Sequence, residues 1–264
     1  MNNINPYQQI PCESIKDLCG FKDDKERMNG FLESAVNSQP INFMVYGERT
    51  TGKSSWINIV KEQANNKDLI TAKFNADRKH GENYYDFYAD LYRSIFESLQ
   101  GLLSKRILED FFNLIDLEII PIRQETGELD RTRMPYQFPL LYDKQRKGEA
   151  VTLTNNIIIS DLKRIVADAR LEKPMVVLID DFHNIIGNET DSVFKAIGQG
   201  EETLPPGLPN DNTNNIINHF KQLTEDFEVK KGFMFVIATY PGLLERKYFE
   251  QYGLNLFDRC FENK

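Results

Sequence analysis

Residues 47–54 read Gly-Glu-Arg-Thr-Thr-Gly-Lys-Ser and match the pattern G-x-x-x-x-G-K-S. The apolar run 41–46 before them predicts a buried strand, and residues 55–61 after them predict a helix. A strand that enters such a loop and a helix that leaves it form the context of a phosphate-binding loop. We therefore expect the chain to bind a nucleoside triphosphate at this turn.

The chemistry of the loop follows from its backbone. Successive N–H groups and the positive end of the helix dipole form a cradle for an anion. Gly47 and Gly52 let the backbone approach phosphate with no Cβ in the way. Lys53 is expected to reach the β- and γ-phosphates as a catalytic charge, and the Ser54 hydroxyl to ligate Mg²⁺. The expected nucleotide-binding residues are Gly47, Glu48, Arg49, Thr50, Thr51, Gly52, Lys53, Ser54 and Ser55.

The composition is that of a soluble globular protein, which we expect to form a single domain over residues 1–264. A net charge of −8 argues against a uniformly basic nucleic-acid surface, although local patches stay open. Cys12, Cys19 and Cys260 are odd in number and lack a C-x-x-C spacing, which favours a reducing compartment. The sequence shows no signal-peptide pattern and no apolar run near the ~18 residues of a membrane span. These features predict a cytoplasmic protein without membrane association.

Apolar runs alternate with amphipathic stretches along most of the chain. This alternation predicts a parallel sheet covered by helices on both faces, a three-layer α-β-α arrangement. The expected strands are 41–46, 69–75, 175–181 and 232–238, and the expected helices are 22–36, 84–103, 155–170 and 216–227. Residues 1–40 are expected to form an extended lead-in followed by the first of these helices.

Residues 104–150 fit this alternation least well, and we interpret them as an insertion. The stretch 107–115 could extend a helical region, whereas 118–123 and 137–142 could be two strands around a turn at 125–128. A β-hairpin, a mobile loop and plain disorder all remain open for this segment.

Two carboxylates, Asp180 and Asp181, end the hydrophobic run 175–179. The carboxyl ends of parallel strands face the ligand crevice, so both side chains are expected near the phosphates. Asp180 would hold Mg²⁺ opposite Ser54. Asp181 is a candidate general base for the attacking water, or it only caps the helix that follows.

Three further residues are candidates for contacts near the γ-phosphate. Thr239 directly follows the strand 232–238 and would face the γ-phosphate or the lytic water, unless a turn satisfies its hydroxyl. Arg259 could serve as an arginine finger toward a neighbouring subunit, or could be a surface arginine. His183 could sense the γ-phosphate, or could be a polar residue at the start of a helix.

The order of these segments resembles a known class. A phosphate-binding loop, an apolar strand ending in Asp-Asp and another ending in Ala-Thr are similar to the additional-strand P-loop ATPases. Within that class the chain is most similar to the AAA+ group that includes origin-recognition-like initiators and bacterial multi-gene-system ATPases, and it resembles the signal-transduction ATPases with numerous domains. Residues 5–7, together with Gly20, Phe21 and Glu26, resemble segments that lie beside the adenine in that group.

The resemblance implies ATP and Mg²⁺ as cofactors and a parallel sheet of five strands. It also implies a homo-oligomer, a partner protein or both, with tasks in replication, transposition or defence against mobile DNA. DNA is a possible partner that the overall charge does not favour. The helical lid of the group is expected to be missing, because the sequence ends at Lys264.

Three functions remain open at this point. The first is an ATP-hydrolysing switch or motor that couples its nucleotide state to oligomerisation or partner binding. The second is a nucleotide-dependent interaction module with negligible turnover. The third is a small-molecule phosphoryl transferase, which would use the insertion's arginines Arg123, Arg131, Arg133 and Arg146.

Overall fold

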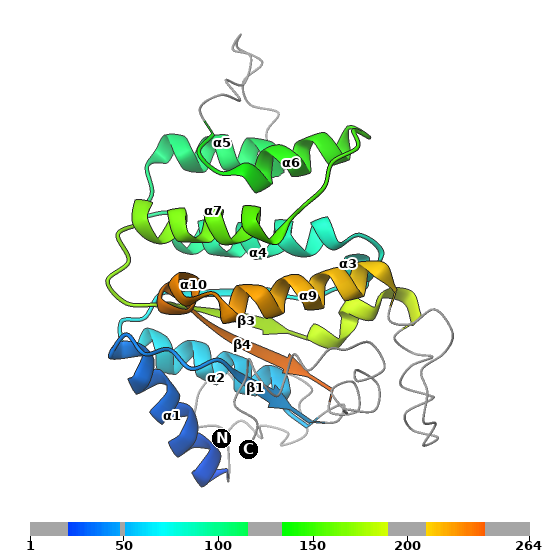
Figure 1. Ribbon diagram of the computed structural model, residues 1–264. Helices are drawn as coiled ribbons and strands as arrows, with labels where there is room; N and C mark the ends of the chain where they lie inside the picture. The colour runs from blue at the N-terminus through cyan, green and yellow to red at the C-terminus, as the bar shows by residue number, and fades with distance from the viewer. Residues whose placement is uncertain (1–20, 48–50, 116–133, 190–209, 241–264) are drawn as a thin grey trace, which may run out of the picture.

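The computed structural model describes residues 21–47, 51–115, 134–189 and 210–240 (Figure 1). Its centre is a parallel sheet of four strands in the order β1-β4-β3-β2. The expectation of five strands is wrong for this part of the chain, since the four apolar runs of the sequence supply four strands. The strands are β1 (Phe43–Tyr46), β2 (Thr71–Asn75), β3 (Met175–Asp180) and β4 (Phe233–Thr239).

The two central strands, β3 and β4, are buried along their whole length. Helices cover both faces of a parallel sheet, so its inner strands lose the alternation of polar and apolar residues and become continuously hydrophobic. All four strands run in the same direction, and their carboxyl ends therefore meet at one edge of the sheet. That edge is where the candidate site lies.

Helices α1 (Lys22–Val36) and α2 (Lys53–Asn65) cover one face of the sheet. Their apolar residues form a cluster with Val176 and Leu178 of β3 and with Val236 and Ala238 of β4. Since the side chains of a strand alternate between its faces, these strand positions identify the α2 face of the sheet.

The opposite face carries the larger hydrophobic cluster, which includes Phe87, Tyr92, Leu162, Phe220 and Phe235. The helices on this face, which Figure 1 shows above the sheet, are α4 (Tyr84–Ser98), α7 (Asn155–Asp168), α9 (Asp211–Glu225) and the short α3 (Lys79–Glu82) and α10 (Phe227–Gly232). The 3-10 helix η2 (Phe182–Glu189) contributes Phe182 and Ile185 to the same cluster.

Helices α5 (Lys105–Ile115) and α6 (Gln137–Arg146) add an outer layer beyond α4 and α7 (Figure 1). The helix expected within 107–115 is confirmed, but the strand expected at 137–142 is wrong because this stretch is α6. Stacked Phe96 and Phe111 rings, 3.8 Å apart, join α4 to α5. The Tyr92 and Phe138 rings, 4.6 Å apart, join α4 to α6. The expected strand at 118–123 lies outside the described residues.

A buried carboxylate on α7 caps α6. Asp161, 2% exposed, accepts hydrogen bonds from the backbone N–H groups of Gln137 (2.9 Å) and Phe138 (2.8 Å). The Tyr92 hydroxyl donates a third bond at 3.3 Å. The first N–H groups of a helix have no partner within the helix, so Asp161 satisfies two of them from another element. None of the described helices combines the length and the apolar character that crossing a lipid bilayer requires.

Candidate functional site

Glycine is favoured at the two glycine positions of the loop for different structural reasons. Gly52 adopts a left-handed backbone with φ 87°, a conformation that glycine enters at little cost, and α2 begins directly after it. A Cβ added at Gly47 would collide with the hydroxyl of Thr51. The backbone therefore favours glycine at both positions, and the N-terminus of α2 follows directly after Gly52. Glu48, Arg49 and Thr50 lie outside the described residues.

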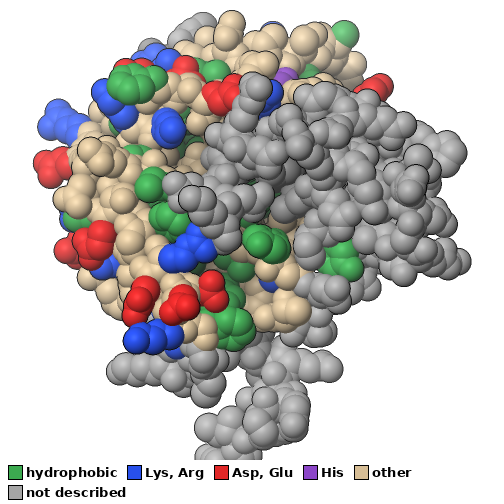
Figure 2. Space-filling model, turned by 60° about the horizontal axis from the view of Figure 1, so that its bottom comes forward, with side chains coloured by type: hydrophobic (Ala, Val, Ile, Leu, Met, Phe, Trp, Pro, Cys, Tyr) green, Lys and Arg blue, Asp and Glu red, His purple; other side chains and the backbone are tan. Residues whose placement is uncertain are grey.

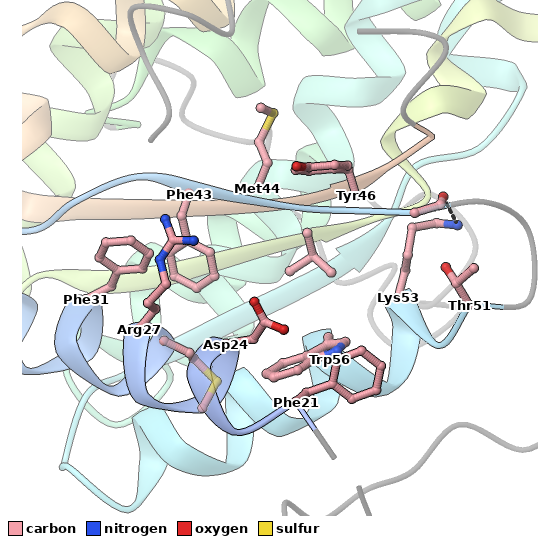
Figure 3. A pocket seen from close by; sticks show the side chains of 13 residues that line it. Phe21, Asp24, Arg27, Phe31, Phe43, Met44, Tyr46, Thr51, Lys53 and Trp56 are labelled. Atoms are coloured by element: carbon pink, nitrogen blue, oxygen red, sulfur yellow. Dashed lines mark hydrogen bonds between the residues drawn. The ribbon is translucent and has the colours of Figure 1, made fainter. Parts of the chain in front are cut away.

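Lys53 lies at the first position of α2 and folds back over the loop. Its ammonium group donates a hydrogen bond to the backbone oxygen of Gly47 at 2.8 Å (Figure 3). The side chain is buried, with 9% of the residue exposed. The ammonium thus lies beside Gly47, the residue at which the phosphate-loop motif begins. Ser55 is buried within α2.

Ser54 and Asp180 come together at the carboxyl edge of the sheet. The Ser54 hydroxyl is hydrogen-bonded to the Asp180 carboxylate, which is 3% exposed. Asp180 follows Val176 and Leu178 at a spacing of two residues, so it is on the same α2 face of the sheet. Its side chain therefore meets the beginning of α2. The backbone N–H of Asp181 donates to Asp180 Oδ1 at 2.9 Å. These contacts fix the orientation of the carboxylate.

The electrostatics of Asp180 reflect its burial. Burial and the neighbouring Asp181 charge raise the pKa of the Asp180 carboxyl, while the Ser54 hydroxyl, Lys73 and the Asp181 N–H act in the opposite direction. For Lys73, burial lowers the pKa and the Asp180 charge opposes that effect. A carboxylate in such a site gains from any further positive charge, which is what a metal ion supplies.

Asp181 follows the strand in a left-handed conformation with φ 52°. Aspartate and asparagine tolerate this region better than most residues do, because their short polar side chains bond locally. The turn is held by a hydrogen bond from the Asn184 N–H to the Asp181 backbone oxygen, 2.9 Å, and by one from the Asn184 side chain to the Ala76 oxygen, 3.1 Å. Asp181 is half-buried at the start of η2, beside His183.

Thr239 ends β4, paired in register with Tyr46 immediately before the loop. The residue is fully buried, and its hydroxyl has no hydrogen-bond partner within the described ranges. Strand alternation places Thr239 on the face of Phe235 and Ile237, opposite to Asp180. The two side chains thus approach the same edge from different faces. Buried hydroxyls nearly always have a partner, and the Thr239 hydroxyl is an exception among the described residues.

A pocket of about 500 Å³ runs from the loop along the α1 side of β1. Gly47, Thr51 and Lys53 line one end, and Phe31 and Phe43, with rings stacked at 5.1 Å, line the other. Figure 3 shows Asp24, Arg27 and Trp56 gathered between α1 and β1. Trp56 lies one helical turn after Lys53, and its ring is 6.0 Å from the half-exposed ring of Phe21. This volume is typical of a small-molecule site.

A comparison with protein-family models matches residues 26–199, about two thirds of the chain, to the KAP family P-loop domain. The chain belongs to this family. Membership makes it a P-loop nucleoside-triphosphatase domain and accounts for the loop at residues 47–54. No curated protein matches the chain.

The donor set of this KAP family domain fits a magnesium ion. Mg²⁺ prefers oxygen ligands and is usually bound through one or two carboxylates together with substrate phosphates. The Ser54 hydroxyl and the Asp180 carboxylate, which are hydrogen-bonded to each other, supply such oxygens beside the phosphate loop. Ser54 and Asp180 would therefore hold the metal, whose charge neutralises the phosphates.

The remaining predicted residues divide into two groups. Arg259 and the three cysteines lie outside the described residues, as do Arg123, Arg131 and Arg133 of the proposed transferase cluster. Arg146 serves packing in the KAP domain, because it donates to the Ile115 backbone oxygen at 2.8 Å and lies 5.4 Å from the centre of the Tyr142 ring.

Sequence reasoning missed several residues of the site. Lys73, which lies beside Asp180, and Asn58, which accepts a hydrogen bond from Lys73, were not identified. Nor was the pocket role of Trp56, although its spacing of three residues from Lys53 on a helix was a usable signal.

Proposed function

We propose that the chain binds ATP and hydrolyses it in a Mg²⁺-dependent reaction, and that it acts as a switch or motor domain. One observation carries the proposal. Lys53, which is hydrogen-bonded to Gly47 of the phosphate loop, is followed by Ser54, which is hydrogen-bonded to Asp180. These are the parts that phosphoryl transfer to water needs, since its catalysis is mostly positioning and charge stabilisation.

Each residue has a role in this proposal. The backbone from Gly47 to Gly52 and the N-terminus of α2 bind the β- and γ-phosphates, and Lys53 adds a charge that follows the γ-phosphate as it leaves. Asp181 acts as the general base that takes a proton from the attacking water. The buried Thr239 hydroxyl, which has no partner among the described residues, holds that water or a γ-phosphate oxygen.

The pocket beside the loop would receive the base of the nucleotide. ATP anchored at Lys53 would extend along β1 toward Phe31, and Trp56 and Phe21 would offer aromatic surface to the adenine. The pocket thus accounts for the part of ATP that the phosphate loop does not touch.

Trp56 is the only tryptophan of the chain, so its fluorescence should report nucleotide binding directly. We expect saturable quenching when ATP is added, because an adenine that stacks on the indole changes its environment. Trp56→Ala should weaken ATP binding about tenfold, since stacking of a base on an aromatic ring contributes about 1–3 kcal/mol. Calorimetry measures the affinity, and Phe227→Ala, at an aromatic residue 66% exposed on α10, is the matched control. An unchanged affinity in Trp56→Ala would place the base elsewhere.

Hydrolysis itself is tested at Asp181. Asp181→Asn should lower the turnover number at least about a hundredfold, the usual contribution of a general base, while ATP affinity stays within about threefold. Phosphate release measures the rate. Asp68→Asn is the control, because the backbone of Asp68 is also left-handed, with φ 58°. Asp68 lies on an exposed turn before β2, at the amino-terminal end of the strands, away from the site. Equal rates in wild type and Asp181→Asn would favour the nucleotide-dependent interaction module with negligible turnover.

The strand order supports the additional-strand class and, within it, the AAA+ resemblance. β4 lies between β1, which carries the phosphate loop, and β3, which carries Asp180. A strand inserted between these two is the feature from which the class takes its name. We propose this subclass for the chain on that basis.

We further propose that the domain is cytoplasmic and couples its nucleotide state to a homo-oligomer or a protein partner, in a DNA-related or mobile-element defence system. On the face seen in Figure 2, acidic and basic side chains are intermingled with exposed hydrophobic ones. This mixture, with a net charge of −8, suits a protein partner better than the DNA backbone. Arg259 would act as a finger across the oligomer interface.

A further inference from the structure

A chain of polar contacts continues from Asp180 to residues that the phosphate loop does not include. The Lys73 ammonium lies 3.9 Å from Asp180 Oδ2 and donates a hydrogen bond to Asn58 Oδ1 at 2.7 Å. Ser54, which is bonded to Asp180, and Asn58 are both on α2. Three elements, α2, β3 and β2, thus contribute to one connected polar cluster.

The periodicities of the elements account for this cluster. Lys73 pairs in register with Leu178, so it is on the α2 face of the sheet, as Asp180 is. Ser54 and Asn58 are four residues apart and occupy the same side of α2. The helix therefore presents its hydroxyl to the carboxylate and its amide to the ammonium, and the two charges meet between them.

Lys73 occupies a position where packing alone would favour an apolar side chain. Its neighbours on this face include Val176 and Leu178, and the lysine side chain is only 22% exposed. Placing an ammonium group there costs desolvation free energy, which the nearby carboxylate and amide offset. The charge of Lys73 therefore accounts for a lysine at this position. The buried acid that it faces is Asp180, the proposed metal ligand.

We propose that Lys73, held by Asn58, is a positioning residue for Asp180 that sets the affinity of the site for Mg²⁺. This inference rests on the proposed function. The Asp181 N–H fixes Oδ1 of the carboxylate while the ammonium faces Oδ2, so the side chain keeps one orientation and is partly neutralised. The ammonium repels an incoming divalent cation, and Mg²⁺ then binds only when the phosphates of a nucleotide add their own negative charge.

The test measures Mg²⁺ binding to the ATP-loaded protein, followed by Trp56 fluorescence and by calorimetry. Lys73→Met and Lys73→Gln remove the charge, and glutamine can keep the bond to Asn58 if methionine impairs folding. Both should bind Mg²⁺ about tenfold more tightly than wild type, because a unit charge at this range repels a divalent cation by that order. Lys73→Arg should stay within about twofold of wild type. Lys144→Met, at an exposed lysine of α6, is the control for charge removal and should also stay within about twofold.

ATP binding in EDTA separates the possible outcomes. All variants should bind metal-free ATP as wild type does, so that the effect of Lys73 appears only with Mg²⁺. A change in ATP affinity that is equal with and without Mg²⁺ would overturn the inference, because the lysine would then act on the phosphates. Unchanged Mg²⁺ affinity in both neutral variants would overturn it as well. A wild-type protein that binds no ATP would instead remove the proposed function itself.

Discussion

Lys53→Met should weaken ATP binding about a hundredfold or more. The substitution keeps the aliphatic stem and removes the ammonium that lies over the loop, 2.8 Å from the Gly47 backbone oxygen. A hydrogen bond from a charged donor contributes about 1.5–3 kcal/mol, and two such bonds to phosphate oxygens correspond to a factor of roughly 10²–10⁴. Calorimetric titration of ATP into the protein, with Mg²⁺ present, gives the dissociation constant.

The control for Lys53→Met is Lys61→Met on the same helix. It changes the net charge by the same amount at an exposed position, so a nonspecific loss of attraction would affect both variants. Lys53→Met should also retain a cooperative thermal transition, since a hydrogen bond such as the one to the Gly47 backbone oxygen contributes only about 1.5–3 kcal/mol. ATP affinity equal to wild type in a folded Lys53→Met protein would refute phosphate binding at this loop.

Asp161→Ala should destabilise the protein by about 3 kcal/mol or more. The change leaves the N–H groups of Gln137 and Phe138 without their acceptor, and each unsatisfied buried donor costs about 1–3 kcal/mol. The loss should concentrate on α6, where backbone amide exchange with deuterium should accelerate before global unfolding. Chemical denaturation measures the total effect. Asp168→Ala removes a bond from the Tyr136 hydroxyl and an exposed ion pair with Arg164, and should cost only about 1–2 kcal/mol.

The same residue gives a pH dependence with a definite sign. Burial raises the pKa of Asp161 to about 6, and the N–H groups of Gln137 and Phe138 oppose the rise. Because the folded-state pKa lies above that of an unfolded aspartate, near 4, the folded protein binds the extra proton. The stabilisation from this proton is full below about pH 4 and disappears as the pH rises through about 6. Asp161→Asn should lack this contribution, so wild type should lose stability relative to it over this range.

The two central strands were predictable because each is a short apolar run bounded by polar residues. The strand expected at 175–181 is β3, Met175–Asp180, and the one expected at 232–238 is β4, Phe233–Thr239. Burial on both faces leaves little choice of residue in such strands. The phosphate loop was predictable for a related reason, since its two glycines and its lysine are required by the backbone and by charge. The fifth strand came from the family resemblance, and no apolar run supported it.

Helix α6 was misassigned because its N-terminal cap is remote in sequence. Residues 137–142 include aromatic and apolar side chains that favour a strand, and Tyr136, at the cap position, makes no side-chain cap bond. The acceptor for the first N–H groups is Asp161, 23 residues beyond Phe138. Pro139 in the first turn was the local sign of a helix start, since proline is tolerated there. Long-range capping of this kind does not appear in a local pattern.

Only half of the proposed magnesium site was predictable from the sequence, for a similar reason. Ser54 and Asp180 belong to motifs, whereas Lys73 and Asn58 meet them only through the register of β2 with β3 and the position of α2 on the sheet. A charged residue within a predicted strand was a hint of this cluster. Its partner could not be named until the strand order was known, because β2 and β3 are adjacent in space but separated by some hundred residues in sequence.

The left-handed backbone at Asp181 restricts the chemistry that substitution can introduce there. A glutamate would reach one methylene further toward a water molecule but would pay roughly 1–2 kcal/mol for this conformation, a cost that asparagine and aspartate largely avoid. The reach of the acid and the geometry of the turn therefore oppose each other at this position. A longer acid at this position would therefore first require a rebuilt peptide turn between Asp180 and Asn184.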